Sequence, residues 1–211
     1  MTRKLFLPGA GGSALFWQPV IERLPANWDC QSLSWPGLGA EPHSDDVTGI
    51  DDLAKLALDR MSCPVDLIAQ SMGGLVAIKA ALRSPTSIRR LVLTATSGGL
   101  PVDDLGGADW RPQYREEFPQ AVSWITEHRE DLSPSLPAIT APTLLLWGEY
   151  DTISPLAVGE RLAALQRNAK LESVRGGHHD LAVSHAGEVA ELITRHLIET
   201  SSFHPTTGHH G

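Results

Sequence analysis

Short apolar stretches with strand character alternate with helical patterns along most of the chain, and this alternation restricts the fold more than any other feature. The strand-like stretches are residues 3–7, 29–35, 65–69, 88–95, 143–147 and 169–174. Apolar residues at helical spacing predict helices at residues 13–24, 50–61, 72–82, 154–165 and 184–199. Strands that alternate with helices pair in parallel, with helices packed on both faces. The sequence therefore predicts an α/β fold with a mostly parallel sheet of about six strands.

The alternation stops between residues 97 and 138, where Gly, Pro, Asp and aromatic residues are frequent. Only residues 119–130 of this segment have a clear helical pattern, and Pro119 suits the first turn of such a helix. A segment this rich in Gly and Pro cannot build a core of its own, so we expect its aromatic side chains to cover an apolar pocket. These are Trp110, Tyr114, Phe118 and Trp124. Simple packing onto the edge of the sheet is the alternative.

The composition suits one globular domain, because the chain has 211 residues, 42% of them hydrophobic. We expect residues 1–199 to form that domain, with residues 97–138 as a short cap insertion and residues 200–211 as a loose tail. The net charge of −8 and the lack of any Lys/Arg run argue against a nucleic-acid partner. No apolar run is long enough to span a bilayer, and the first residues lack the apolar stretch of a signal peptide. We expect a cytoplasmic protein with a small-molecule substrate and no membrane partner, and the oligomeric state stays open.

A serine stands at a sharp strand-to-helix junction after the third strand-like stretch. The sequence there is Ala69-Gln70-Ser71-Met72-Gly73-Gly74, and an apolar helical pattern follows directly. A nucleophile elbow has this form: small residues flank a serine whose hydroxyl projects above the sheet, and the dipole of the next helix stabilises negative charge. The usual pattern is Gly-x-Ser-x-Gly, and Ala69 stands in place of its first glycine. A serine that only caps the helix is the alternative.

Two other strand ends carry the partners that such a serine needs. Asp151 follows the stretch 143–147, and His178 and His179 follow the stretch 169–174. The carboxyl ends of parallel strands meet at one edge of a sheet. Serine is a weak nucleophile unless a base takes its proton, and an acid must hold that base in the right tautomer. The chain order serine, acid, histidine fits this arrangement, although a turn aspartate and solvent-exposed histidines are the alternatives.

A glycine-rich loop, Pro8-Gly9-Ala10-Gly11-Gly12, follows the first strand and lets backbone N–H groups face the space above the sheet. A plain tight turn is the alternative, and the lack of a following Gly-Lys-Ser/Thr argues against a phosphate-binding loop. Neither the two cysteines, Cys30 and Cys63, nor the adjacent histidines make a ligand set for zinc. We expect no metal and no cofactor.

Taken together, these motifs resemble the α/β-hydrolase superfamily over residues 3–198. The motifs are the glycine-rich loop, the elbow, Trp147-Gly148-x-x-Asp151 and Gly176-Gly177-His178-His179. The resemblance implies that Ser71 is the nucleophile, Asp151 the acid and one of the two histidines the base. It also implies an oxyanion hole formed by the backbone N–H groups of Ala10 and Met72.

The resemblance further implies a variable cap over the active site, at the position of residues 97–138, and here the cap is short. Pro8 departs from the family, which commonly has histidine at that position of the glycine-rich loop.

The family also offers a reason to choose between the histidines, because its Gly-His pair precedes a proline-acid helix start by about seven residues. With His179 as the base, the final helix begins at the expected distance, with Glu188 in its first turn. With His178 as the base, the Gly-His pair is intact but the helix shifts by one residue. We expect His179 to be the base, because packing fixes the position of the helix.

The resemblance implies a small-cap serine esterase that cleaves a carboxylic ester, thioester or lactone through an acyl-enzyme on Ser71. A lyase of the menaquinone-pathway synthase type would use the same three residues to abstract a proton. A non-catalytic ligand-binding protein, like the hormone-receptor-like members of the superfamily, is the alternative outside enzymes. A dehalogenase is disfavoured, because that group has Asp at the elbow.

Overall fold

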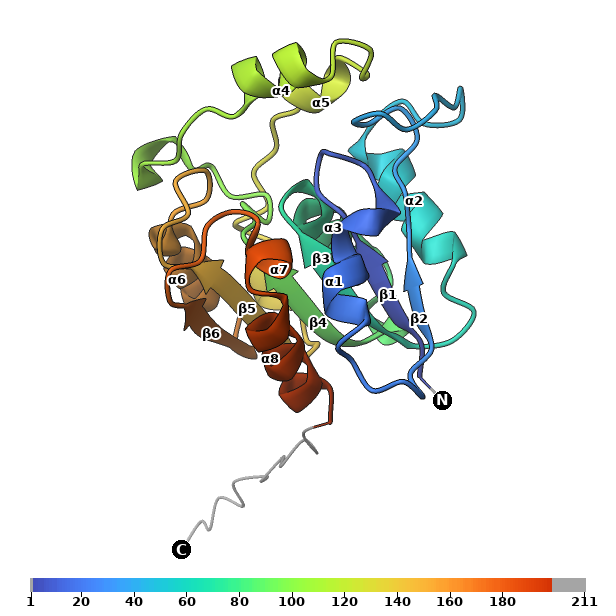
Figure 1. Cartoon of the computed structure of the whole chain (residues 1–211), viewed down its shortest axis with the longest axis vertical. Helices are drawn as coiled ribbons and strands as arrows, with labels where there is room; N and C mark the ends of the chain where they lie inside the picture. Colours follow the sequence, from blue (N-terminus) through green and yellow to red (C-terminus); the bar gives the residue numbers. More distant parts are fainter. Residues whose placement is uncertain (1, 199–211) are drawn as a thin grey trace, which may run out of the picture.

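Six strands pair in parallel in the order β2-β1-β3-β4-β5-β6. They are β1 (Lys4–Leu7), β2 (Cys30–Ser32), β3 (Val65–Gln70), β4 (Ile88–Thr94), β5 (Thr143–Gly148) and β6 (Ala169–Val174). The computed structural model describes residues 2–198, and the tail expected at residues 200–211 lies outside the described residues. The predicted α/β fold with a parallel six-stranded sheet is confirmed (Figure 1).

Helices cover both faces of the sheet, as the alternating pattern predicts. One face carries α2 (Ile50–Asp59), α3 (Met72–Arg83) and α6 (Leu156–Leu165). The other carries α1 (Gln18–Ile21), α7 (Leu181–Ser184) and α8 (Ala186–Ile198), with the 3-10 turn η1 (Ala14–Trp17) beside them. A further 3-10 turn, η2 (Pro85–Ser87), links α3 to β4.

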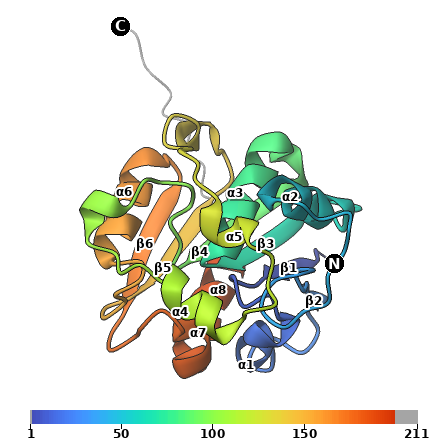
Figure 2. The same cartoon turned by 90° about the horizontal axis from the view of Figure 1, so that it is seen from above.

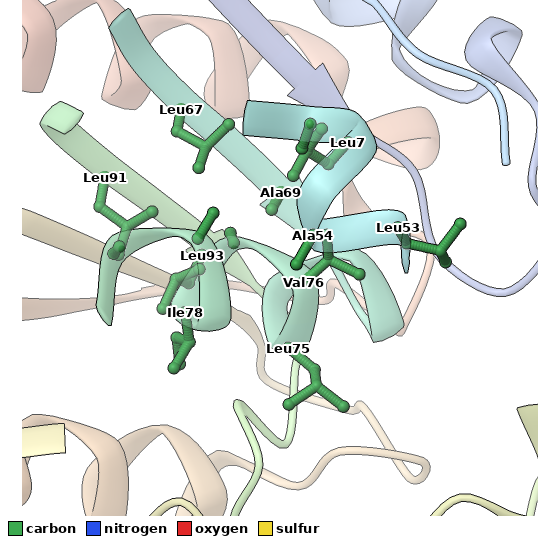
Figure 3. Close-up of a cluster of buried hydrophobic side chains, with 14 of the residues drawn as sticks. Leu7, Leu53, Ala54, Leu67, Ala69, Leu75, Val76, Ile78, Leu91 and Leu93 are labelled. Carbon is green, nitrogen blue, oxygen red and sulfur yellow. The ribbon is translucent and has the colours of Figure 1, made fainter. Parts of the chain in front are cut away.

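Alternating strand residues feed two separate hydrophobic layers. On β3, Leu67 and Ala69 face α2 and α3, whereas Ile68 between them faces α1 and α8. Figure 3 shows the first layer, in which Val76 and Ile78 of α3 pack beneath the strands. Because β3 is buried on both faces, Val65 and residues 67–69 are apolar, as is typical of strands in parallel sheets, and the buried Asp66 is paired with Lys4 and Arg89.

The predicted helices at 50–61, 72–82 and 154–165 differ from α2, α3 and α6 by no more than two residues at one end, whereas the stretches 13–24 and 184–199 each span parts of two elements. The stretch 13–24 is split into η1 and α1. Pro19 falls in the first turn of α1 and has no backbone N–H group to donate a helical hydrogen bond. The helix expected at 154–165 begins at Leu156, and the Ser154 side chain makes no capping hydrogen bond. The final helix begins at Ala186, because the chain turns at His185 (φ −123°, ψ 34°) after α7.

Within residues 97–138, the segment expected to form the cap and called the cap below, α4 and α5 lie above the carboxyl ends of the strands (Figures 1 and 2). The cap contains η3 (Asp103–Leu105), α4 (Arg111–Glu117), α5 (Trp124–Glu127) and η4 (Leu136–Ala138). The single helix predicted at 119–130 is therefore wrong. A residue before proline is driven out of the α region, so Phe118 (φ −125°, ψ 66°) ends α4 ahead of Pro119.

Hydrogen bonds and ion pairs join the cap to the body of the molecule on two sides. On one side, the Val122 amide donates to the Gly37 carbonyl at 2.9 Å. On the other, Lys79 of α3 binds the cap carboxylate of Glu130 at 2.6 Å and the α2 carboxylate of Asp51 at 2.9 Å. Lys79 is 8% exposed, so this ion cluster ties α2, α3 and the cap together at a nearly buried ammonium.

Candidate active site

Ser71 occupies a strained turn between β3 and α3. Its backbone angles are φ 52° and ψ −123°, in a region that residues with a side chain rarely adopt. A Cβ on Gly73 would overlap the Pro8 carbonyl, and one on Gly74 would overlap the Thr96 side chain. The Thr96 hydroxyl donates to the Ser71 carbonyl at 2.5 Å. The turn therefore needs glycine at positions 73 and 74, and Thr96, which follows β4, holds the Ser71 carbonyl.

The structure brings Ser71, His179 and Asp151 into one hydrogen-bonded chain. The His179 Nε2 atom lies 3.0 Å from the Ser71 Oγ atom, and His179 Nδ1 lies 2.9 Å from Asp151 Oδ2. The serine follows β3, the acid follows β5 and the histidine follows β6. All three positions lie at the carboxyl edge of the sheet, which is why residues so distant in sequence meet there.

Asp151 is held rigidly beneath the histidine. Its side chain is fully buried, and its Oδ1 atom accepts hydrogen bonds from the backbone N–H groups of Ile153 and Ser154, both at 2.9 Å. These bonds compensate a buried carboxylate and leave Oδ2 to face His179. Asp151 is thus arranged to orient the imidazole, as the acid of a catalytic triad must.

His178 points away from this chain of hydrogen bonds. Its Nδ1 atom lies 3.2 Å from the Tyr150 carbonyl oxygen, its side chain is exposed, and its ring packs 5.9 Å from the Tyr150 ring. Of the two adjacent histidines, only His179 lies between Ser71 and Asp151. The placement agrees with the argument from the position of the final helix.

The glycine-rich loop after β1 lies directly against the elbow. A Cβ on Gly9 would come within 3.1 Å of the Ser71 Cβ atom. Ala10 and Met72 both line the cavity that contains Ser71 and His179. The Met72 amide opens α3, and the first N–H groups of a helix have no partner within it. Neither the Ala10 nor the Met72 amide donates to another backbone group of residues 2–198, so both are available to an oxyanion.

A cavity of about 1000 Å³ separates the sheet edge from the cap, and Ser71 and His179 lie in its wall. Its apolar lining comes from both sides and includes Leu75, Leu100, Val102, Phe118 and Ile125. Three of the four cap aromatics line it, as expected. Trp124 does not, so the prediction that it covers the pocket is wrong: its side chain packs against the hydrophobic core without reaching the cavity.

Several supporting residues escaped the sequence analysis. Thr96 braces the elbow, Gln70 bonds the His179 carbonyl through its Nε2 at 3.4 Å, and Ala95 joins the cavity wall with a positive φ of 47°. Thr96 follows the end of β4, so a search of every strand end for polar residues would have found it. No local pattern distinguishes Gln70 or Ala95, because their roles depend on neighbours that are distant in sequence.

Across residues 2–198, His, Cys, Asp and Glu side chains nowhere gather in threes as metal ligands would. None of the helices that these residues form combines the length and apolar character needed to cross a bilayer.

Comparisons with known proteins agree with this geometry. A model of the alpha/beta hydrolase family matches residues 5–192. The pimeloyl-[acyl-carrier protein] methyl ester esterase of Neisseria meningitidis serogroup A is 27% identical over 236 residues, covering 90% of this chain and 75% of that protein.

Two solved structures share the fold. A meta-cleavage product hydrolase from Pseudomonas fluorescens covers 93% of this chain and 90% of its own, with a TM-score of 0.76 and 17% identity. An esterase from Thermogutta terrifontis covers 93% of this chain and 89% of its own, with a TM-score of 0.75 and 20% identity. At these identities the likeness establishes the fold alone.

Proposed function

The chain belongs to the alpha/beta hydrolase family, and we propose that it is a serine hydrolase that cleaves a carboxylic ester, thioester or lactone through an acyl-enzyme on Ser71. The observation that carries the proposal is the hydrogen-bonded chain from Ser71 through His179 to Asp151, which opens into a large apolar cavity. Ser71 is the nucleophile, His179 the general base and Asp151 the residue that orients it.

In the first half of the reaction, Ser71 Oγ attacks the carbonyl carbon while its proton passes to His179 Nε2. The negative oxygen of the tetrahedral intermediate accepts hydrogen bonds from the Ala10 and Met72 amides. The bond to the leaving group then breaks, and His179 gives its proton to the departing alcohol or thiol. The acyl group remains on Ser71.

Water completes the cycle by the same route. It gives a proton to His179 and attacks the acyl carbon, and the new intermediate collapses with Ser71 Oγ as the leaving group. That oxygen recovers the proton from His179, and the carboxylic acid is released. No cofactor or metal enters this scheme.

The shape of the cavity favours an acyl group with an apolar chain. Its volume of about 1000 Å³ is at the upper end of ordinary ligand pockets. Leu75, Val102 and Phe118 give it an apolar wall near the serine. The similarity to a pimeloyl-[acyl-carrier protein] methyl ester esterase also supports an acyl ester as the substrate. We propose a small-molecule acyl ester as the substrate and the cytoplasm as the place of action.

The test combines a probe for the nucleophile with a panel of substrates. A fluorophosphonate should label Ser71 in a one-to-one ratio, and p-nitrophenyl esters of increasing acyl length, assayed beside thioesters and lactones, should show turnover. The Ser71→Ala variant should lose the label and lower kcat by about 10⁴-fold or more. Alanine fits the turn, so an unchanged melting temperature serves as the folding control.

The outcomes separate the candidate functions. Labelling at Ser71 without turnover of any acyl substrate would favour a lyase that abstracts a proton with the same three residues. A folded protein that is neither labelled nor active would favour a non-catalytic ligand-binding protein. Ester turnover that persists in folded Ser71→Ala would rule out the acyl-enzyme.

A further inference from the structure

The hydroxyl of one cap tyrosine reaches across the cavity to the glycine-rich loop. Tyr114, on α4, donates its O–H to the Ala10 carbonyl at 2.8 Å and accepts the Gly39 N–H at 2.9 Å. Its side chain is buried, with 8% of the residue exposed. Tyr114 and Ala10 lie 104 residues apart, so this bond is a direct link between the cap and the residue proposed above as an oxyanion donor.

We propose that Tyr114 is a positioning residue for the oxyanion hole: its hydroxyl fixes the Ala10 backbone so that the Ala10 amide faces the reacting carbonyl oxygen. This inference rests on the proposed function, because it assigns Tyr114 a role in the same acyl transfer. It adds to that function a cap residue that controls the rate of the chemical step rather than the affinity for substrate.

The loop needs such support because its sequence is unusually free to move. Glycines flank Ala10 on both sides, a Cβ on Gly11 would meet nothing within 4 Å, and Gly12 has a positive φ of 74°. Glycine restricts φ and ψ less than any other residue, so the Ala10–Gly11 peptide must be held by contacts of the folded chain. The Gly11 carbonyl packs closely against Gly39, and the Ala10 carbonyl is held by Tyr114. Within residues 2–198, no group other than the Tyr114 hydroxyl donates to the Ala10 carbonyl.

The ends of the loop are held by other bonds, which leaves Ala10 as the point that Tyr114 must fix. The Gly12 amide donates to the Gly9 carbonyl at 3.1 Å, and the Trp35 amide donates to the Gly12 carbonyl at 2.8 Å. The Ala10 N–H and C=O groups lie on the two peptide planes that share its Cα atom. Holding the carbonyl therefore limits the rotation that sets the direction of the amide.

The surroundings of Tyr114 keep its hydroxyl in place as a donor. Its ring packs against Trp110 and Phe118, with centroid distances of 5.5 and 5.2 Å. Burial raises the pKa of the Tyr114 phenol above its ordinary value of 10, so the hydroxyl stays protonated across the neutral range. The Gly39 N–H occupies the hydroxyl oxygen as acceptor and thereby directs its proton toward Ala10.

The experiment compares Tyr114→Phe with wild type on the best ester of the panel. Removing an oxyanion donor outright lowers kcat by about 10²–10³-fold, and loosening one should have a smaller effect. We expect kcat to fall about 10-fold with KM changed by less than twofold. The second-order rate of fluorophosphonate labelling should fall in parallel, because the phosphoryl oxygen enters the same hole. Both rates are divided by the concentration of serine that the probe can label, so unfolded protein in the sample does not lower them.

Two control variants isolate the contact with Ala10. Tyr150→Phe makes the same substitution at an exposed tyrosine outside the cavity. Both kcat and the rate of fluorophosphonate labelling should stay at the wild-type level. Gln120→Ala removes another bond between the cap and the same neighbouring loop, the 3.0 Å contact of Gln120 Nε2 with the Gly39 carbonyl. Gln120 does not touch Ala10, so this variant should keep kcat within about twofold.

The results distinguish this inference from the proposed function. An active wild type whose Tyr114→Phe variant keeps both rates would overturn the positioning role and leave the serine mechanism intact. Equal losses of rate in Tyr114→Phe and Gln120→Ala would mean that attachment of the cap, and not the bond to Ala10, causes the effect. A rise in KM at constant kcat in Tyr114→Phe would mean that the tyrosine acts in substrate binding. Either result would contradict the proposal. A wild type without labelling or turnover would overturn the proposed function, and the inference with it.

Discussion

The backbone of Ser71 is strained, and its neighbours in the fold hold it there. A positive φ at a residue with a side chain costs about 1–3 kcal/mol. The strand β3 and the helix α3 fix the chain on either side, and the Thr96 hydroxyl binds the Ser71 carbonyl. The strain lifts the serine oxygen out of the sheet to within 3.0 Å of His179 Nε2. The reactive geometry is thus a property of the assembled fold and not of the local sequence.

The adjacent histidines should behave oppositely when each is replaced. His179→Ala removes the base and should lower kcat for the best ester by about 10³-fold or more. His178→Ala removes a ring that packs on Tyr150 and lies outside the chain of hydrogen bonds, and kcat should stay within about threefold. Steady-state kinetics and thermal melts of the two purified variants make the comparison. An inactive, folded His178→Ala beside an active His179→Ala would reverse the assignment.

At the scale of the elements, Lys79 links α2, α3 and the cap, and Arg83 of α3 binds the same Asp51 carboxylate at 2.6 Å. Lys79→Met keeps most of the side-chain volume but leaves Glu130 and Asp51 without their ammonium partner. Breaking a fully buried ion pair costs about 3–5 kcal/mol. Both carboxylates reach water here, with 26% and 63% of their side chains exposed, so we expect a loss of about 1–2 kcal/mol in the free energy of unfolding. Urea denaturation measures it.

A matched control is the exposed pair of Lys55 and Asp59, which lie on one helix at 3.0 Å. Lys55→Met should change the free energy of unfolding by less than about 0.5 kcal/mol, as exposed pairs of this type do. Equal losses in the two variants would mean that burial of the Lys79 ammonium contributes nothing.

The stability conferred by Lys79 should depend on pH in a defined direction. The hydrogen bond from Lys79 lowers the pKa of Asp51, so this stabilisation is present above the ordinary value of 3.8 and is lost as the pH falls below it. Burial alone would lower the pKa of Lys79, but the bonds to Glu130 and Asp51 outweigh burial and raise it. The stabilisation that comes from the raised pKa of Lys79 persists below pH 10.5 and is lost only as the pH rises further. The difference between wild type and Lys79→Met should therefore be constant from pH 5 to 10 and should shrink below about pH 4, as urea titrations at each pH would show.

The two cap tryptophans offer a second matched pair at this scale. Trp110 lines the cavity, whereas Trp124 packs against the core with its indole N–H buried and unpaired within residues 2–198. Trp110→Ala should move the preferred acyl length by two carbons or more, with a small change in melting temperature. Trp124→Ala should lower the melting temperature by several degrees and leave the preference unchanged. Hydrolysis rates across the ester panel and thermal melts distinguish these results, and an exchange of the two phenotypes would contradict the cavity lining.

Across the whole molecule, sequence reasoning succeeded where short-range patterns determine structure and failed where distant contacts do. The inner strands of a sheet covered on both faces are rich in apolar residues, and the polar residues that follow them in the chain fall at one edge. That logic placed Ser71, Asp151 and the adjacent pair His178 and His179 at one edge of the sheet, and the choice of His179 came from the family resemblance. The helices of the cap were misplaced, because Phe118 and Pro119 end α4 in a segment without a periodic pattern. The bond from Tyr114 to Ala10 could not be foreseen, since it joins residues that meet only after the cap has docked.

The order of the strands along the chain also determines when the active site can form during synthesis. Ser71 follows β3, yet His179 follows β6, which docks at the far edge of the sheet beside β5. A nascent chain that has already paired β1 with β3 still carries an inert serine, because its base has not yet been synthesised. Reactivity at Ser71 therefore requires that β6 has been synthesised and has docked beside β5. In refolding from urea, fluorophosphonate labelling should recover after the far-ultraviolet circular dichroism does, and the lag between the two signals would measure the docking of β6.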